Sequence, residues 1–319
     1  MQRCIIQVWT YTIMFLVLFS GLYSAEATTE ESPIQNLDVK VLNEIKHNRS
    51  SWTQGLLIYE DYIYESTGLY NFSTLQKINM TNGETEKILY HNESIFAEGL
   101  TSYDHKLIQL TYKSNIAFVF DIETFELIDS YQYSGEGWGL CTMSDFFVMS
   151  NGSSQLALRD LETFEIIEEI NVTRNGKPVN NLNELECVGD LIFSNIWLTD
   201  EIVAIDSKSG NVTKSVNVDN LIDRSVYKDS NVLNGIAYDN NDSSFWITGK
   251  YWPYLFEVNF VENNNTNSEI NENIVDERNI SQLDSELQFF DSKSFIFISY
   301  TFLFIMVIFW LIDVKIRRN

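Results

Sequence analysis

One short pattern recurs five times along this 319-residue chain, and it constrains the fold more than any other feature. In four of the five copies, a polar or aromatic residue is followed by Gly and then by an aliphatic residue. The steps between copies are 44, 40, 45 and 51 residues, with Glu184 as an alternative alignment in the fourth copy. Such a period is typical of repeat architectures built from small β-sheets. The equivalent positions are Gln54, Glu98, Trp138, Asn183 and Asn234.

Two further segments follow each copy of the pattern, in the same order each time. About twelve residues later comes a short apolar strand that ends in polar or aromatic residues, and then a turn with an acidic or Asn-rich patch, clearest in residues 121–126 and 160–165. β-Branched and aromatic residues are frequent in these segments, as they are in strands. Four strands in 40–50 residues make one propeller blade. The alternative, a β-sandwich, does not explain five phased copies. The sequence therefore predicts an all-β fold, a five-bladed β-propeller over residues 38–261.

The last repeat ends near Phe260 with only three strands, whereas residues 38–45 alternate apolar and polar side chains ahead of the first repeat. We expect this early segment to be the outer strand of the last blade, which would close the ring and remove open sheet edges. Residues 262–293 are rich in Asn, Glu and Ser and have little to bury, so they are predicted to form a flexible tether.

Apolar segments mark both ends of the chain. Residues 9–22 follow a basic start and precede small residues, which indicates a signal peptide over residues 1–26; an uncleaved anchor is the alternative. Residues 294–312 are long enough to cross a bilayer, and a basic tail follows at 313–319. The alternatives for residues 294–312 are a buried core helix and a lipid-anchor signal, but neither is normally followed by a basic tail. We expect a single-pass type I membrane protein of the secretory pathway, with a lumenal or extracellular domain.

The composition excludes several classes of function. The chain has 45 Asp and Glu against 21 Lys and Arg, so nucleic acid is not an expected partner. Ten Asn-x-Ser/Thr sequons suit a glycoprotein. Outside the predicted signal peptide only Cys141 and Cys187 remain, and the sequence leaves their pairing open. The three histidines have no metal-ligand spacing, so no metal site is predicted.

In a propeller, the first strand of each blade lines the central channel. The five equivalent positions should therefore surround one axis, and Tyr112, Trp197 and Lys250, at the ends of second strands, should reach the same mouth. A concave site with aromatic walls and few polar groups suits a small ligand or a chain terminus. Each residue also has a structural alternative: the two tryptophans could be core aromatics and Glu98 a solvated carboxylate.

Seven motifs in order then make the chain resemble the glutaminyl-peptide cyclotransferase family known from papaya latex and from bacteria. The resemblance covers about residues 38–261. Its motifs are Thr53-Gln54-Gly55-Leu56, Tyr64-Glu65-Ser66-Thr67-Gly68, Glu98-Gly99-Leu100-Thr101, Gly135-Glu136-Gly137-Trp138-Gly139-Leu140, Asn183-Glu184-Leu185-Glu186, Asn231-Val232-Leu233-Asn234-Gly235-Ile236-Ala237-Tyr238 and Thr248-Gly249-Lys250 with Trp252-Pro253.

The resemblance implies that the chain acts on peptides or proteins and cyclises their N-terminal glutamine to pyroglutamate, with release of ammonia and without a cofactor. We expect the protein to be a monomer. The resemblance assigns the general acid/base to Glu98. The other implied catalytic residues are Gln54, Asn183 and Lys250, and the implied substrate-binding residues are Trp52, Phe96, Tyr112, Trp138 and Trp197.

Some positions depart from the family pattern. Trp52, Ala97 and Tyr112 stand where the family usually has Phe, Gly and Trp, and Cys141 and Cys187 replace its more usual Thr and Tyr. Trp52 and Tyr112 are still aromatic. We therefore expect a changed substrate preference or rate rather than loss of activity. The competing hypothesis is an inactive membrane-anchored propeller that binds peptide ends or surface partners.

Overall fold

The computed structural model describes residues 33–262, and every regular element in that range is a β-strand. The predicted signal peptide, transmembrane helix and cytoplasmic tail lie outside the described residues, as does all of the predicted tether except its first residue. No helix long and apolar enough to cross a membrane occurs in residues 33–262. The all-β prediction is confirmed for this part of the chain.

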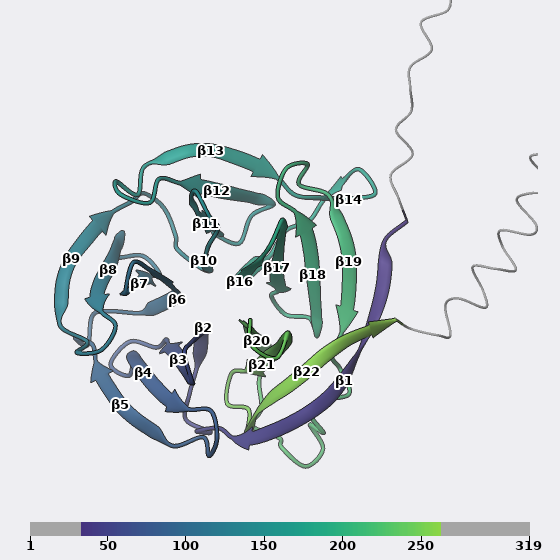
Figure 1. Ribbon diagram of the computed structural model, residues 1–319, viewed down its shortest axis with the longest axis horizontal. Coiled ribbons are helices and arrows are strands. Elements are labelled where there is room, and N and C mark those ends of the chain that lie inside the picture. Colours follow the sequence, from purple (N-terminus) through teal and green to yellow (C-terminus); the bar gives the residue numbers. More distant parts are fainter. Residues whose placement is uncertain (1–32, 263–319) are drawn as a thin grey trace, which may run out of the picture.

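Three four-stranded antiparallel sheets follow one another along the chain, each with its strands in sequence order (Figure 1). The first contains β2 (Thr53–Tyr59), β3 (Tyr62–Thr67), β4 (Thr74–Asn79) and β5 (Thr85–Tyr90). The second contains β6 (Ala97–Tyr103), β7 (Lys106–Thr111), β8 (Ile116–Asp121) and β9 (Leu127–Gln132). The third contains β10 (Leu140–Thr142), β11 (Phe147–Met149), β12 (Gln155–Arg159) and β13 (Ile166–Asn171).

An eight-stranded sheet completes the fold and consists of two four-stranded halves. One half contains β16 (Leu182–Val188), β17 (Leu191–Ile196), β18 (Glu201–Asp206) and β19 (Val212–Asn217). The other contains β20 (Leu233–Asp239), β21 (Ser244–Gly249), β22 (Tyr254–Glu262) and β1 (Gln35–Lys46). A small hairpin of β14 (Thr173–Arg174) and β15 (Lys177–Pro178) precedes the first half.

The sheets stand around a common axis, with β2, β6, β10, β16 and β20 innermost (Figure 1). Clusters of buried apolar side chains lie between neighbouring sheets. Between the first two sheets, for example, Leu57 and Leu75 belong to one cluster with Leu100 and Phe120. Each sheet therefore buries both of its faces against neighbours, which gives a β-propeller-like architecture.

Strand β1 joins the two ends of the folded region, as residues 38–45 were predicted to do. It pairs antiparallel with β22 from Leu37↔Glu262 to Lys46↔Tyr254, and parallel with β19 from Gln35↔Lys214 to Leu37↔Val216. Leu37 and Ile45 point into buried clusters. The prediction of ring closure by this strand is confirmed.

The repeated acidic turns have a local cause in the sequence. Asp121 accepts hydrogen bonds from the backbone N–H groups of Glu123 and Thr124, and Asp160 accepts the equivalent bonds from Glu162 and Thr163. Aspartate favours such turns because its short side chain reaches the backbone two and three residues ahead. The turns therefore form from local sequence, and each positions the outer strand that follows.

Glycines let the inner strands approach closely near the axis. A Cβ atom on Gly99 would lie 2.6 Å from the backbone N of Leu140, and one on Gly139 would lie 2.1 Å from the backbone O of Asn183. No side chain fits at either distance. The recurring Gly of the sequence pattern is thus required by strand packing.

Cys141 of β10 and Cys187 of β16 form a disulfide, a pairing that the sequence had left open. The bond connects the innermost strands of two neighbouring sheets across a sequence separation of 46 residues. Closing a loop of this length restricts the unfolded chain.

We expect the Cys141→Ser/Cys187→Ser double variant to lose about 2–4 kcal/mol of unfolding free energy, because the unfolded chain regains that freedom. Urea denaturation monitored by tryptophan fluorescence measures the loss. The wild-type protein unfolded in the presence of a reducing agent is the control and should match the variant. Equal stability of oxidised wild type and variant would contradict the prediction.

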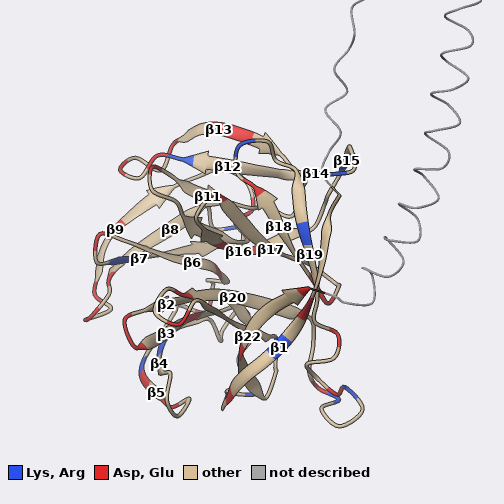
Figure 2. Cartoon of the chain, turned by 45° about the vertical axis from the view of Figure 1, so that its right-hand side comes forward, with Lys and Arg blue, Asp and Glu red and all other residues tan. Residues whose placement is uncertain are grey.

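Acidic residues are spread over the turns and outer strands of the described region, with Lys and Arg scattered among them (Figure 2). On the outer strand β13, for example, Glu168 and Glu169 are both exposed. The predicted acidic character therefore belongs to the solvent-facing surface of the folded domain.

Candidate active site

A pocket of about 180 Å³ opens at the end of the axis where the innermost strands begin. Its volume is on the scale of one amino-acid side chain with its backbone. All nine residues to which the sequence assigned catalytic or substrate-binding roles line this pocket. They are Trp52, Gln54, Phe96, Glu98, Tyr112, Trp138, Asn183, Trp197 and Lys250.

Three of the polar residues occupy the same place in three different sheets. Gln54, Glu98 and Asn183 are the second residues of β2, β6 and β16, and in each strand the pairing with its neighbour is irregular at that point. A β-bulge turns a side chain out of the regular alternation. The repeated bulge therefore directs one polar side chain from each of these strands toward the axis.

The remaining residues come from the loops at the same mouth. Tyr112, Trp197 and Lys250 directly follow β7, β17 and β21, as the repeat pattern predicts, and Trp138 lies two residues before β10. Because the start of an inner strand and the end of its antiparallel neighbour lie at one edge of a sheet, these side chains converge.

Aromatic rings form the walls of the pocket. Trp138 and Trp197 meet edge to face with ring centroids 5.5 Å apart, and Phe96 and Tyr112 are 5.6 Å apart. The Lys250 ammonium lies 5.0 Å from the Trp52 ring centroid, within range of a cation–π interaction. Apolar walls lower the local polarity, which strengthens the electrostatic interactions between the groups they surround.

Glu98 is the carboxylate of this pocket and is only 5% exposed. Burial raises its pKa well above the ordinary glutamate value; the positive charge of Lys250 opposes that shift, and Glu136 adds to it. Proton exchange near neutral pH requires a raised pKa of this kind. No side-chain hydrogen bond engages the Glu98 carboxyl group within residues 33–262, so it remains available to a substrate.

Gln54 has a defined orientation because of Asn234. The Asn234 Nδ2 group donates to the backbone O of Thr53 at 3.0 Å and to Gln54 Oε1 at 3.0 Å. A backbone carbonyl can only accept, so the Asn234 amide orientation is fixed, and with it that of Gln54. The Gln54 NH₂ group is therefore left as the donor for the pocket. Asn234 was recognised as part of the repeat but not as a site residue.

Asn183 offers an acceptor. Its Oδ1 atom is buried and has no hydrogen-bond partner among the described residues. Its backbone O accepts from Ser150 Oγ at 2.7 Å, which holds the strand start in place. An unpaired buried acceptor is costly, and a substrate N–H group would satisfy it.

The neighbouring Glu184 has a different place, which settles the alternative alignment of the fourth repeat. Its carboxylate accepts hydrogen bonds from the backbone N–H groups of Leu56 at 3.1 Å and Ile236 at 2.7 Å. Burial raises its pKa well above the usual range, and the nearby Glu186 adds to the shift. Glu184 ties β16 to β2 and β20 across the axis, while Asn183 faces the pocket.

A buried network that the sequence did not predict supports one side of the pocket. Glu65 accepts from Ser51 Oγ at 3.1 Å and Thr53 Oγ1 at 2.6 Å, and it pairs with His47 Nε2 at 3.0 Å. The His47 Nδ1 atom lies 3.0 Å from the backbone O of Trp252.

Both ring nitrogens of His47 therefore face acceptors, which favours the imidazolium. Burial opposes the charge, but the Glu65 carboxylate and the hydrogen bonds outweigh it and raise the pKa of His47. Ser51 and Thr53 flank Trp52, and Trp252 follows Lys250 by two residues. The network thus holds two lining segments together. Its sequence signal was the presence of Thr53, Glu65 and Trp252 in three of the family motifs.

No group of three or more His, Cys, Asp or Glu side chains with metal-binding geometry occurs within residues 33–262.

Lys250→Met is expected to make the protein more stable at neutral pH, although it removes a lining residue. Burial lowers the pKa of Lys250 to about 8, against a partial opposing effect of Glu98. The folded state therefore binds fewer protons than the unfolded chain between pH 8 and about 10.4, and wild-type stability rises with pH over that window. Below pH 8 the full cost of burying the charge, about 3 kcal/mol, destabilises the wild type.

Urea midpoints measured at pH 7 and pH 10.5 test this expectation. The variant should exceed the wild type at pH 7, and the difference should shrink as the pH rises. Lys208→Met serves as the control, because Lys208 is an exposed lysine in a weak surface pair with Asp190. A Lys250→Met variant less stable than the wild type at pH 7 would contradict the assigned pKa.

Comparison with known proteins agrees with the architecture. The family model described as glutamine cyclotransferase matches residues 14–260. A glutaminyl-peptide cyclotransferase of Arabidopsis thaliana is 31% identical over 226 residues, which cover 69% of this chain and 71% of that protein. The crystal structure of Myxococcus xanthus glutaminyl cyclase superposes with a TM-score of 0.68 at 31% identity, covering 73% of this chain and 100% of the other.

The family match spans more than half of the chain and includes every lining residue of the pocket. The chain therefore belongs to the glutamine cyclotransferase family.

Proposed function

We propose that this protein cyclises the N-terminal glutamine of peptides and proteins to pyroglutamate with release of ammonia, and that Glu98 carries the proton. Membership of the glutamine cyclotransferase family supports the reaction. The observation that supports the role of Glu98 is a single buried carboxyl group of raised pKa among aromatic walls, with Lys250 in the same pocket.

The reaction is an intramolecular acyl transfer. The α-amine attacks the side-chain amide carbon, the new C–N bond closes a five-membered ring, and the former amide nitrogen leaves as ammonia. The substrate supplies the proximity of its two groups, so the enzyme mainly orients them and moves protons. An α-amino group has a reference pKa of about 7.7–8.0, so its neutral, nucleophilic form is accessible near neutral pH.

Glu98 then has two tasks. As a carboxylate it accepts the proton that the attacking amine loses, and as a carboxylic acid it donates a proton to the departing nitrogen. Burial raises the pKa of Glu98 and favours the carboxylic acid, whereas the positive charge of Lys250 favours the carboxylate. One carboxyl group can therefore serve both steps without a net change of protonation over the cycle.

The oxygen of the attacked amide gains negative charge, and two groups are suited to stabilise it. Gln54 presents an NH₂ donor because Asn234 occupies its carbonyl oxygen. Lys250 presents an ammonium group. Donors fixed before the reaction stabilise developing charge without reorganisation. Asn183 Oδ1 is placed to accept from the substrate amine.

Ammonia release from a glutamine-initiated peptide tests the proposal. The purified protein should release one equivalent of ammonia and lower the mass of the peptide by 17 Da, the mass of that ammonia. A peptide that begins with asparagine and is otherwise identical should be unaffected. A protein that binds the glutamine peptide without releasing ammonia would instead be a binding module, and the proposed activity would be wrong.

We further propose that the propeller has five blades, and that β20, β21, β22 and β1 form the fifth blade. Support comes from the repeated order of four strands in each group and from the buried clusters between neighbouring groups. An experimental structure in which β1 joined a different sheet would contradict this count.

We also propose that the folded domain faces the lumen or the extracellular space as a monomer, held by a single C-terminal span at residues 294–312 with the tail 313–319 in the cytoplasm. The apolar ends and the basic tail of the sequence support this orientation. Protease added to sealed vesicles should spare the domain and remove only the tail. Digestion of the domain in intact vesicles would reverse the assignment, and a dimer mass in sedimentation would exclude the monomer.

A further inference from the structure

We propose that a groove beside the pocket binds the peptide chain that follows the N-terminal glutamine of the substrate. The inference rests on the proposed function and extends it, because it gives the substrate residues that follow the glutamine a binding surface of their own. The occupant is an extended peptide segment with apolar side chains.

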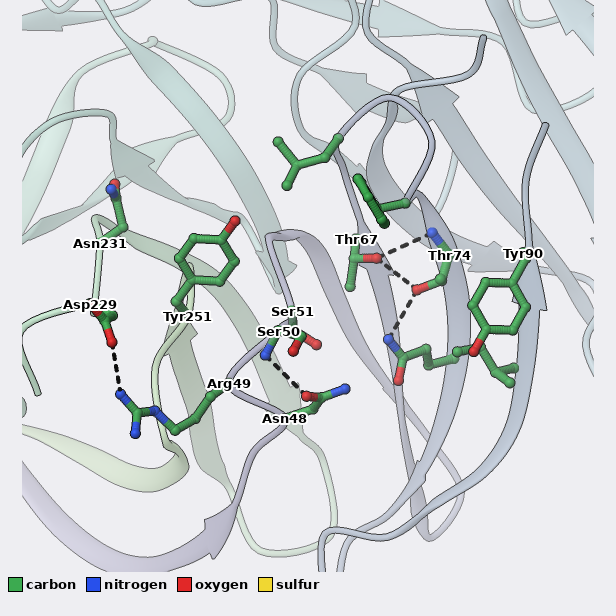
Figure 3. Close-up of a pocket in the computed structure, with 14 residues that line it drawn as sticks. Asn48, Arg49, Ser50, Ser51, Thr67, Thr74, Tyr90, Asp229, Asn231 and Tyr251 are labelled. Atoms are coloured by element: carbon green, nitrogen blue, oxygen red, sulfur yellow. Dashed lines mark hydrogen bonds and ion pairs between the residues drawn. The ribbon is translucent and has the colours of Figure 1, made fainter. Parts of the chain in front are cut away.

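The groove has a volume of about 780 Å³, more than four times that of the pocket. It lies between the first sheet and the loops that precede β2, precede β20 and follow β21. Figure 3 shows Tyr251 on one side and Tyr90 on the other, with Ser50 and Ser51 between them. The space is therefore large enough for several residues of an extended chain.

Two chain segments belong to both the groove and the pocket. Ser51 lines the groove and Trp52 lines the pocket; Tyr251 lines the groove and Lys250 lines the pocket. The rings of Trp52 and Tyr251 meet edge to face with centroids 5.0 Å apart. The boundary between the two cavities is thus a pair of aromatic side chains.

A third segment shares the same boundary. Thr67 and Leu69 line the groove, whereas a Cβ atom on Gly68 would lie 2.4 Å from the Phe96 ring and 2.9 Å from Gln54 Cγ. The Gly68 backbone therefore packs directly against two lining residues of the pocket. A substrate whose first residue occupies the pocket has its second residue at this boundary, and the groove begins there.

The groove has the chemistry of a peptide-binding surface. Phe72 and Tyr90 are each 70% exposed, and Ile88 is 40% exposed. Large apolar side chains exposed together on one side of a groove commonly mark an interaction site. Tyrosine provides contact area together with a hydroxyl group, which suits binding of a polar main chain with apolar side chains.

Hydrogen-bonding groups face the same space. Within residues 33–262 the hydroxyl groups of Tyr90 and Tyr251 have no hydrogen-bond partner, and Asn231 uses its Oδ1 atom for the backbone N–H of Val232 but keeps its NH₂ group. An extended peptide presents unpaired N–H and C=O groups that need such partners. The groove therefore supplies both kinds of contact that a peptide requires.

The test compares kcat/KM for glutamine amide with kcat/KM for a glutamine-initiated pentapeptide that has apolar residues at positions two to four. Phe72→Ala and Tyr90→Ala are the groove variants, since both side chains are exposed and neither lines the pocket. Ile167→Ala is the matched control: its side chain is 59% exposed, on β13, outside the groove.

Asn48 lines the groove and begins a sequon, so the protein is first treated with an endoglycosidase.

We expect the wild type to prefer the pentapeptide. Each groove variant should lose roughly fivefold to tenfold in kcat/KM for the pentapeptide, mainly through KM, with no change for glutamine amide. The control should match the wild type on both substrates. Groove variants that keep the wild-type ratio of the two substrates would overturn the groove while leaving the cyclase activity intact. Absence of turnover with both substrates would overturn the proposed function and this inference with it.

Discussion

Glu98→Gln should lower kcat by roughly 10²- to 10⁴-fold, the usual contribution of general acid–base catalysis, while KM changes little. Glutamine keeps the size of the side chain and most of its hydrogen-bonding capacity but cannot accept or return the proton. The lost interaction is made in the transition state and not in the ground state, so substrate binding should persist.

Folding is not expected to limit this experiment. The wild-type carboxyl group is buried and has a raised pKa, so the folded state disfavours its charge and a neutral amide is tolerated there. Thermal unfolding of Glu98→Gln should therefore resemble that of the wild type. A variant that loses activity because it unfolds would be recognised by this measurement.

Two nearby carboxylates provide matched controls. Glu136 pairs with Lys113 at 3.1 Å and accepts from Trp138 Nε1 at 3.1 Å, so its role is to hold a wall of the pocket. Glu186 accepts from the backbone N–H of Tyr238, and burial raises its pKa to about 8, but it does not line the pocket. Gln replacements at these positions should cost far less turnover.

The assignment of the acid/base would be wrong under one clear result. If Glu98→Gln kept near-normal kcat while Glu186→Gln or Glu136→Gln abolished it, another carboxyl group would carry the proton. The architecture would stand in that case, because the Glu98 side chain makes no hydrogen bond or ion pair to another residue within 33–262.

Deletion of residues 38–46 should abolish cooperative folding of the domain. These residues supply eight of the nine residue pairs between β1 and β22, and Ile45 belongs to the buried cluster between the last and first sheets. Without them, β22 becomes an exposed edge strand and Ile45 leaves a void, and His47 loses the strand that positions it against Glu65.

A chain that ends after Glu262 is the control, because it keeps every described strand. Circular dichroism and near-ultraviolet spectra during heating measure the outcome. The control should show one cooperative transition, and the deletion variant should show none. A deletion variant with the same transition temperature as the control would disprove the role of β1 in closing the ring.

Much of the fold followed from the sequence because its signals are local and repeated. Successive units repeat the order of four strands, and three of them carry an Asp-based turn, at Asp121, Asp160 and Asp206, that makes the same backbone contacts in each. Local hydrogen bonds of this kind depend on residues two or three positions apart, so a sequence pattern can identify them.

The convergence of seven of the nine lining residues also followed from the repeat, whereas Trp52 and Phe96 were assigned only by the family resemblance. Positions that recur in phase must surround one axis once the sheets form a ring, and Gln54, Glu98 and Asn183 do so at equivalent bulges. The family motifs then assigned chemical roles to these positions, a step that periodicity alone could not take.

The supporting contacts and the charge states were decided only by the tertiary structure. Asn234 orients Gln54 across 180 residues, His47 pairs with Glu65, and Cys141 bonds to Cys187. These interactions depend on which distant side chains meet at the closed ring, and a pKa depends on how completely the assembled fold removes water. The sequence therefore determined which residues surround the axis, whereas long-range packing determined how they are oriented, paired and charged.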